Sequence, residues 1–440
     1  MMIFRSIIIF IGLLKVCSCA PRLESFLQYC VQAEPLKGNL IDADYWDDDE
    51  PSTYEPPTMP YDFFDLGLIQ RKAEGVGNFL ISPFGVKTAI GLLAEASTDT
   101  TQVELINALG FQTDRYANRK KYSEINNFMK MNSTANVMDA GSRIYLNTSN
   151  TPRARFAAIA QEFYGTDLVN LDYSNPTLAS QDINSWVSAV TKGRIPDLIT
   201  EAEFRDASLM VMNTMFIHGT WRHQFDSRRA TARVFYYTAR TSKILPFMRV
   251  QNTFYYAESL VFDAKILRMP FLGKKLAMNI IIPNSSTGFA RIMDNLQELH
   301  KEMGFLRERL VDVNLPKFQF ADITSYRQIL SELGVREAFG ATASFPGVSR
   351  GQQLNGRWKL STVLQKVGIE VNEFGPISRY KSDEASDTSA IGAVLEVIAN
   401  RPFFFFVEYE PLRQVLLAGR LADPAPPPVR VPIPLTLPWN

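Results

Sequence analysis

The sequence has few of the residues from which most catalytic and metal sites are built. Its 440 residues include only three histidines, His218, His223 and His300. His218 and His223 lie five residues apart, with no carboxylate or third ligand at metal-binding spacing. No G-x-S-x-G, Walker-type, H-E-x-x-H or C-x-x-C motif occurs. We therefore expect a protein that is not an enzyme and that needs no metal or other cofactor.

An excess of charge of either sign is also absent. The chain has 46 basic and 46 acidic residues, so its formal net charge at pH 7 is zero. This balance argues against general binding to nucleic acid or to anionic membranes. After the N-terminus, no apolar run is long enough to span a bilayer. We expect a monomer that binds neither nucleic acid nor membrane.

The N-terminus has the pattern of a secretory signal peptide, assigned to residues 1–20. Arg5 supplies the positive start, residues 7–14 the short apolar core, and small residues follow it. Lys15 interrupts the core, and Pro21 would be a poor first residue after a cut. An uncleaved N-terminal anchor is therefore the alternative. The prediction is a secreted, extracellular protein.

Cysteine is equally scarce, and its placement bears on the secreted form. Cys17 and Cys19 would leave with the signal peptide, so the mature chain would keep Cys30 alone and no internal disulfide. Cys30 would then be either a free thiol or the site of an intermolecular pair. Three sequons fit a secreted glycoprotein, at Asn132, Asn147 and Asn284.

Two segments outside the main pattern resemble tails. Residues 21–61 are acidic and proline-rich without an apolar period, which predicts disorder. Tyr45, Tyr54 and Tyr61 lie among or beside acidic residues, the setting in which secreted proteins are tyrosine-sulfated. This tail is either a solubilising segment or a docking segment. Residues 425–440 form a proline-rich tail that cannot join a central sheet.

Between the tails, residues 62–424 show one continuous pattern. Helix-like runs come first, and strand-like runs dominate later. This order predicts an α+β fold rather than alternating βαβ units. The helix-like runs are 85–97, 115–132 and 181–195, and the strand-like runs are 209–217, 275–283, 311–320, 370–374 and 403–409. Between the last two lies a polar passage with neither period, and loops of more than about 15 residues in compact domains are usually functional or disordered.

Eight motifs occur in the order in which the serpin family has them, and they span about 360 residues. They are NFLISPFGVKTAIGLLAEAS (78–97), INSWVSAVTKGRI (183–195), NTMFIHGTWRHQF (213–225), ILRMPFLG (266–273), MNIIIP (278–283), VNLPKFQF (313–320), GIEVNEFG (368–375) and RPFFFFVEYEPLRQVLLAGRLADP (401–424). The chain thus resembles a serpin. The resemblance implies one α+β domain with three β-sheets, eight or nine helices, and an exposed reactive-centre loop at about 375–395.

The resemblance also implies a mechanism without catalysis. In inhibitory serpins a target protease cuts the loop, whose freed part enters the main sheet as a new strand. The acyl-linked protease is dragged along and trapped. The energy comes from a metastable fold that is released by strand insertion.

The root of the loop departs from the inhibitory pattern. Glu373 and Gly375 match the family's hinge, but Pro376 takes the first inward position, lacks an N–H and fixes φ. Tyr380 is bulky, and a buried Glu384 would cost on the order of several kcal/mol. The inward set is Pro376, Ser378, Tyr380, Ser382 and Glu384, and a one-residue slip would instead turn Arg379 and Lys381 inward.

These residues predict slow insertion, so the protease would escape. We therefore expect a non-inhibitory or weakly inhibitory serpin that acts by binding or as a protease substrate. The alternative is a genuine serine protease inhibitor. For that alternative, alignment of the loop places the scissile bond among Ser389, Ala390 and Ile391. With no Arg or Lys there, an elastase- or chymotrypsin-like protease is the predicted target.

Two further groups take their roles from the resemblance. Ser82, Asn213 and Gln365 correspond to the cluster at which the main sheet opens. Gln365 stands where the family has histidine, and Gly85 where it has serine. Gln365 can still bond Asn213, so the changes are either a loss of function or compensated drift.

The second group lies in the stretch 115–130. A similarly placed helix binds heparin in glycosaminoglycan-activated serpins. The corresponding residues are Arg115, Arg119, Lys120 and Lys121. They would bind a polyanion or form an ordinary solvated helix face, since Glu124 interrupts the stretch and Asn132 lies nearby.

Overall fold

The fold is described by a computed structural model, which covers residues 54–424 apart from 113, 132–135, 149–150, 206, 274, 350–357 and 376–392. The signal peptide and the C-terminal tail lie outside these residues. Within them are nine α-helices: α3 (Phe63–Lys72), α4 (Pro83–Ala96), α5 (Asp99–Leu109), α6 (Arg115–Lys130), α7 (Ala154–Tyr164), α8 (Pro176–Val190), α9 (Gly288–Asp294), α10 (Leu299–Gly304) and α11 (Arg327–Glu332).

The strands lie in two hydrogen-bonded sheets. They are β1 (Phe79–Ile81), β2 (Asn136–Asn147), β3 (Thr166–Leu171), β4 (Leu209–Gly219), β5 (Thr231–Tyr236), β6 (Ser242–Ser259), β7 (Ala264–Pro270), β8 (Leu276–Pro283), β9 (Arg307–Pro316), β10 (Phe318–Ser325), β11 (Leu360–Val371), β12 (Leu395–Ile398), β13 (Phe403–Tyr409) and β14 (Gln414–Leu421). The mixture of these strands with nine helices confirms the α+β prediction.

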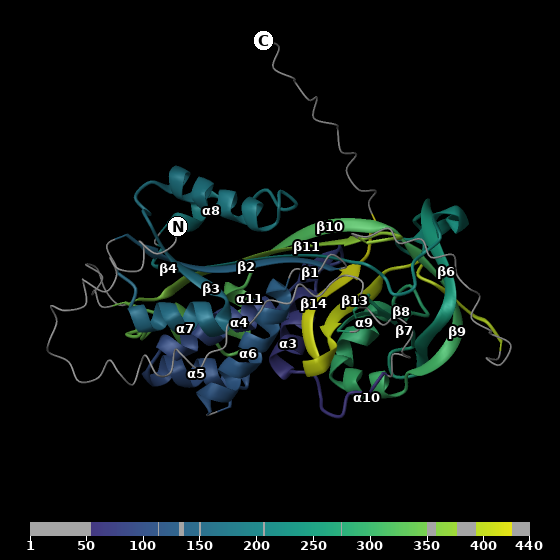
Figure 1. Ribbon diagram of the computed structural model, residues 1–440, viewed down its shortest axis with the longest axis horizontal. Coiled ribbons are helices and arrows are strands. Elements are labelled where there is room, and N and C mark those ends of the chain that lie inside the picture. The colour runs from purple at the N-terminus through teal and green to yellow at the C-terminus, as the bar shows by residue number, and fades with distance from the viewer. Residues whose placement is uncertain are drawn as a thin grey trace, which may run out of the picture. The chain divides into compact units, whose positions relative to one another are not determined.

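The five-stranded sheet has the order β10-β11-β4-β2-β3. Helix α8 covers one of its faces, and α4, α6 and α7 lie under the other (Figure 1). Strand β4 is buried along its whole length, because both of its faces are covered. Met210 and Met212 pack with Ile183 of α8, whereas Val211 belongs to the core on the opposite side.

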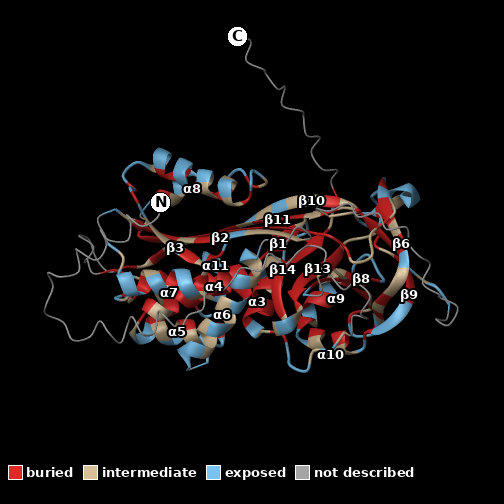
Figure 2. Cartoon of the chain, in the orientation of Figure 1, coloured by how far each residue is buried: buried red, intermediate tan, exposed pale blue. Residues whose placement is uncertain are grey.

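The second sheet has the order β1-β14-β13-β8-β7-β6-β9-β12, with β5 paired to β6. Strand β6 is 18 residues long. Its first part pairs with β5 and its last part with β7, so it joins regions that would otherwise be separate sheets. The three sheets implied by the resemblance therefore form two continuous networks among the described residues. Strands β13 and β14 are buried throughout (Figure 2).

The boundaries of several elements differ from the sequence expectations for local reasons. Helix α8 begins at Pro176 rather than 181, because Asn175 caps it and proline suits the first helical position. The expected strand 311–320 is two strands, since the chain leaves the second sheet after Pro316 and enters the first at Phe318. The expected strand 370–374 ends at Val371, where β11 gives way to a turn.

Part of the segment expected to be a disordered tail packs on the domain. The Tyr54 hydroxyl donates to the Met303 carbonyl at 3.1 Å, and its ring lies against the Arg268 guanidinium. Tyr61 is buried, and its hydroxyl donates to Glu408. Packed structure is thus present from Tyr54 onward, and both phenols are engaged in the fold. Tyr45 lies outside the described residues.

Candidate functional site at the root of the long loop

The root of the long loop is a tight turn that follows β11 directly. The Asn372 side-chain oxygen accepts hydrogen bonds from the backbone N–H groups of Phe374 (3.1 Å) and Gly375 (2.8 Å). Gly375 has φ +72°, and a Cβ there would lie 2.3 Å from the Gly219 carbonyl oxygen. Only glycine therefore fits this position.

Two other segments hold the turn in place. The Trp221 indole N–H donates to the Asn372 carbonyl at 2.9 Å, and the Phe225 N–H donates to the Glu373 carbonyl at 3.2 Å. The Glu373 carboxylate is buried and forms an ion pair with Lys317 between β9 and β10. The two predicted hinge residues that are described, Glu373 and Gly375, are thus brought together by tertiary contacts.

The turn lies at the end of a closed seam between β11 and β4. These strands pair in parallel from Leu360 opposite Leu209 to Ile369 opposite Ile217. No described strand lies between them, and the described chain resumes at Ala393, shortly before β12. A new strand could enter here only if this ladder first separated.

The other predicted loop residues lie outside the described part of the chain. They are the hinge positions Pro376, Ser378, Tyr380, Ser382 and Glu384, and the scissile region Ser389, Ala390 and Ile391.

A buried glutamine ties the seam to the helix layer beneath it. The Gln365 amide nitrogen donates to the Asn213 side chain at 2.7 Å and to the Ser82 carbonyl at 3.0 Å. Its oxygen accepts from the Ser82 N–H and from the Tyr326 hydroxyl, both at 2.8 Å. Both donors and both acceptor positions of the amide are thus used. Gln365 is 1% exposed, so water cannot reach the amide, and these protein partners have to satisfy it.

This geometry brings together the three residues expected at the sheet-opening point, Ser82, Asn213 and Gln365. It adds Tyr326, which precedes α11 and which sequence reasoning missed. No local signal marks Tyr326, because its bond to Gln365 exists only once the two segments have packed.

Gly85 and Gln365 depart from the family pattern together, and the structure links them. A Cβ at Gly85 would lie 2.4 Å from the Asn213 side-chain oxygen, which is the atom that accepts from Gln365. A serine at 85 would therefore displace Asn213 from the position that Gln365 requires. The two departures fit each other, which favours compensated drift over a defective cluster.

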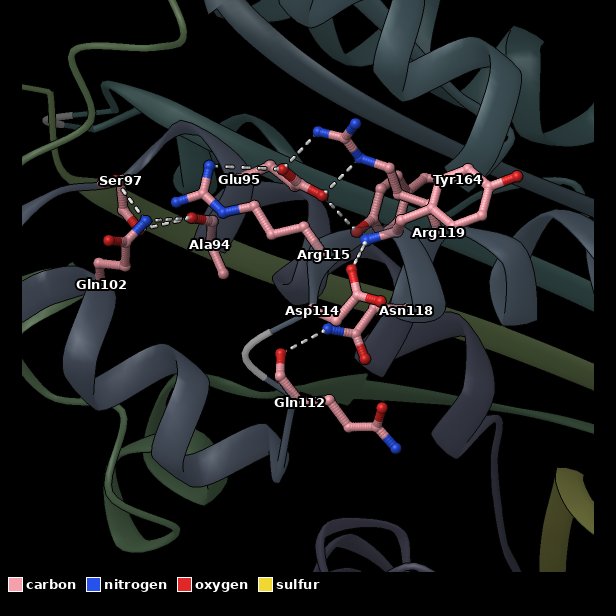
Figure 3. A network of polar contacts seen from close by, with 11 residues as sticks. Ala94, Glu95, Ser97, Gln102, Gln112, Asp114, Arg115, Asn118, Arg119 and Tyr164 are labelled. Atoms are coloured by element: carbon pink, nitrogen blue, oxygen red, sulfur yellow. Dashed lines mark hydrogen bonds and ion pairs between the residues drawn. The ribbon is translucent and has the colours of Figure 1, made fainter.

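The predicted basic stretch on α6 is largely occupied by intramolecular contacts. Arg119 binds the Glu95 carboxylate with two nitrogens, at 2.9 and 2.8 Å, and the Tyr164 hydroxyl donates to the same group at 3.1 Å (Figure 3). Arg115 lies 3.9 Å from Glu95. Lys121 is partly buried, and burial lowers its pKa. Of the four residues only Lys120 and Arg115 are exposed, so the stretch does not present four cations together.

The sequons occupy different settings. Asn284 is exposed in the turn after β8, and its amide donates to Asp263 at 3.0 Å. Asn147 is the last residue of β2 and is half-buried, with its oxygen accepting from the Thr148 hydroxyl at 3.3 Å. Asn132 lies outside the described residues. Asn284 is the more accessible of the two described sites.

The histidines do not assemble a catalytic or metal site in the described part of the chain. His223 packs edge-on to Phe254, and burial lowers its pKa to about 4. His218 lies beside Asn372 and Glu370. Across the residues that the structure describes, no three side chains of the metal-binding types come together, and no helix is long and apolar enough to cross a membrane.

Comparisons with known proteins agree with this architecture. The family model described as "Serpin (serine protease inhibitor)" matches residues 63–424. "Serine protease inhibitor 2" of Anopheles gambiae is 30% identical over 82% of this chain and 91% of its own length. "Leukocyte elastase inhibitor" of Sus scrofa is 27% identical, over 82% and 97% respectively. Human thyroxine-binding globulin complexed with its hormone has a similar structure, with a TM-score of 0.73 at 20% identity, covering 82% of this chain and 96% of the globulin. The chain belongs to the serpin family.

Proposed function

We propose that this serpin is secreted and does not trap proteases efficiently, and that it acts by binding or as a protease substrate. The observation that carries the proposal is the position of Pro376. It follows directly after Gly375, whose left-handed turn is held by Asn372. The chain at the start of insertion therefore meets a residue without an N–H and with a fixed φ.

Insertion has to compete with release of the trapped protease. Opening the root requires loss of the bonds to Asn372 and Glu373 described above, each with a net value of about 0.5–1.5 kcal/mol. The segment then has to form ladders with β11 and β4, and Pro376 can donate to neither. Tyr380 and Glu384 would follow on the same face. Each added barrier of about 1.4 kcal/mol slows insertion about tenfold.

A groove among the described residues supports a binding role. A groove of about 710 Å³ lies between α3 and α9. Its apolar lining includes Phe63, which is 83% exposed, and Leu333, while its charged lining has two cations, Arg71 and Arg420, and two anions, Glu74 and Asp294. The exposed ring and the balanced charges suit a small, mainly apolar aromatic molecule. The probe 1-anilinonaphthalene-8-sulfonate should bind wild type, and Ala290→Trp, which fills the groove, should weaken binding. Equal binding of the probe by wild type and by Ala290→Trp would show that the groove is not the binding site.

Inhibition of a serine protease is the second candidate. It is favoured by relatives that are named as protease inhibitors, including the elastase inhibitor. The scissile region Ser389, Ala390 and Ile391 contains no basic residue. An elastase- or chymotrypsin-like enzyme would therefore be the target.

A denaturing gel separates the two candidates. Wild type incubated with elastase, chymotrypsin or trypsin should yield cleaved chain without a band at the summed mass. Pro376→Thr, alone and with Tyr380→Ala and Glu384→Ala, should increase any covalent complex. The matched control is Arg379→Ala with Lys381→Ala, which changes the outward face and should have no effect. A stable complex formed stoichiometrically by wild type would overturn the leading proposal.

The extracellular assignment and the polyanion site are tested separately. The secreted chain should lose Cys17 and Cys19 and carry a glycan at Asn284, which mass spectrometry of the exported protein would show. Since Arg119 is bound to Glu95, we expect flow-through from heparin resin at low salt. Salt-sensitive retention on heparin resin, reduced by Lys120→Ala, would instead support a polyanion site.

A further inference from the structure

His218 and Asn372 connect the seam strand β4 to the turn at the loop root. The Asn372 side-chain nitrogen lies 3.2 Å from His218 Nε2 and donates to Glu370 at 3.0 Å. The Asn372 oxygen faces the other way and accepts the N–H groups of Phe374 and Gly375. Those two backbone donors fix the orientation of the amide.

This orientation determines the protonation of the imidazole. Because the Asn372 nitrogen carries only hydrogens, His218 Nε2 must be the acceptor and therefore has no proton. The neutral ring carries its proton on Nδ1, which lies 3.7 Å from the Glu370 carboxylate. His218 is 8% exposed, so water cannot easily replace these partners.

Protonation of His218 would place an N–H opposite an NH₂ group. If the Asn372 amide turned over to accept from the imidazolium, its nitrogen would face the Phe374 and Gly375 N–H groups, and its oxygen would face Glu370. Either arrangement loses hydrogen bonds in a buried site. Protonation of His218 is therefore unfavourable while the Asn372 turn is closed, and it becomes favourable once the turn is released.

We propose that His218 is a positioning residue that, through Asn372, holds the loop root closed when neutral and releases it when protonated. The geometry is independent of whether the loop traps proteases, so the proposal goes beyond the function above. It gives this serpin an acid-sensitive loop root.

The charged groups around His218 come from three segments. Glu370 is on β11, and Arg194 lies in the segment after α8. Arg194 is paired with Asp139 of β2 at 2.7 Å, and Lys192 binds the same carboxylate at 2.8 Å. Burial lowers the pKa of His218, Glu370 opposes that effect, and Arg194 adds to it. A hydrogen bond from a protonated ring to Asn372 would also raise the pKa, but it needs the Asn372 oxygen, which the Phe374 and Gly375 N–H groups occupy. Release is therefore expected below neutral pH.

The first experiment measures hydrogen exchange at single amides between pH 4.5 and 7.5, corrected for intrinsic rates. In wild type, protection of Phe374 and Gly375 should fall about tenfold or more as His218 protonates, as expected for loss of one buried hydrogen bond. In His218→Gln, which keeps an acceptor but cannot titrate, protection should stay constant. The matched control His223→Gln should retain the wild-type pH profile.

The second experiment measures the reverse effect, that of Asn372 on the pKa of His218. It does not require the His218→Gln variant to fold. The chain has only three histidines, so their imidazole NMR signals can be assigned with single variants. Asn372→Ala removes the opposing NH₂ group, so the pKa of His218 should rise while that of His223 stays unchanged. Constant protection through the His218 titration, or an unchanged pKa in Asn372→Ala, would overturn the proposal.

Discussion

A buried carboxyl on α3 gives the prediction with the largest pH effect. Asp65 is 1% exposed and accepts a hydrogen bond from Gln414 at 2.6 Å through one oxygen. Its other oxygen has no hydrogen-bond partner among the described residues. Burial is the main cause that raises the pKa of Asp65 to about 6, while Lys87 opposes it. Lys87 is already paired with Asp62.

The sign of the effect follows from linkage. The folded chain holds the Asp65 proton more tightly than the unfolded chain, whose pKa is 3.8. The contribution of Asp65 to the free energy of unfolding is therefore fully present below pH 3.8, and it is lost as the pH rises through about 6. Two pKa units correspond to about 3 kcal/mol. Asp65→Asn removes this loss and keeps an oxygen for Gln414, so it should stabilise the protein at pH 7.

The expected shift can be measured in thermal unfolding. With an unfolding entropy of about 2.1 cal/mol/K per residue, 3 kcal/mol in a domain of this size is roughly 4 °C in Tm. Asp65→Asn should raise the Tm by up to that amount at pH 7 and by almost nothing at pH 4. The exposed Asp294→Asn, scanned at the same rate, is the control. A lower Tm at pH 7 would refute the reasoning, because it would mean that Asp65 is charged and stabilised by Lys87.

Three other substitutions test the site and its support. Gly375→Ala should lower Tm and speed proteolysis at the loop root, since its Cβ would meet backbone 2.3 Å away, whereas Gly304→Ala has nothing within 4 Å and should be silent. Gly85→Ser should lower Tm, and adding Gln365→His should recover part of the loss; a recovery of zero would deny that the two positions are coupled. Glu408→Gln removes a buried charge partner of Arg268 and should lower the free energy of unfolding by about 3 kcal/mol or more. A change within error would show that Glu410 alone is enough to pair with Arg268.

Most of the architecture could be predicted from the sequence because it is recorded in local patterns. The run 209–217 is apolar on both faces except at Asn213 and Thr214, and β4 is covered on both faces. The helix-like run 85–97 is confirmed as α4, although the helix begins earlier, at Pro83, because Ser82 caps it. Element ends were less predictable, because the separation of β9 from β10 depends on which sheet each part joins.

The site was less predictable for a physical reason. Sequence motifs pointed to Ser82, Asn213 and Gln365, but gave no sign of the bond from Tyr326. They also gave no sign that Glu95 occupies Arg119, since these residues lie 24 positions apart on different helices. A basic stretch can therefore look available in sequence when its charges are already satisfied in the fold.

The contacts at the seam change the weight of the evidence on inhibition. Gln365 satisfies every partner at the point where the sheet would open, and Gly85 makes room for it. A family histidine can thus be lost without leaving an unpaired group, so the cluster gives no reason to expect a defect. The hinge differs, because a ladder of backbone hydrogen bonds requires a backbone N–H and Pro376 has none. The non-inhibitory interpretation therefore depends on the residue that follows Gly375 and not on the seam.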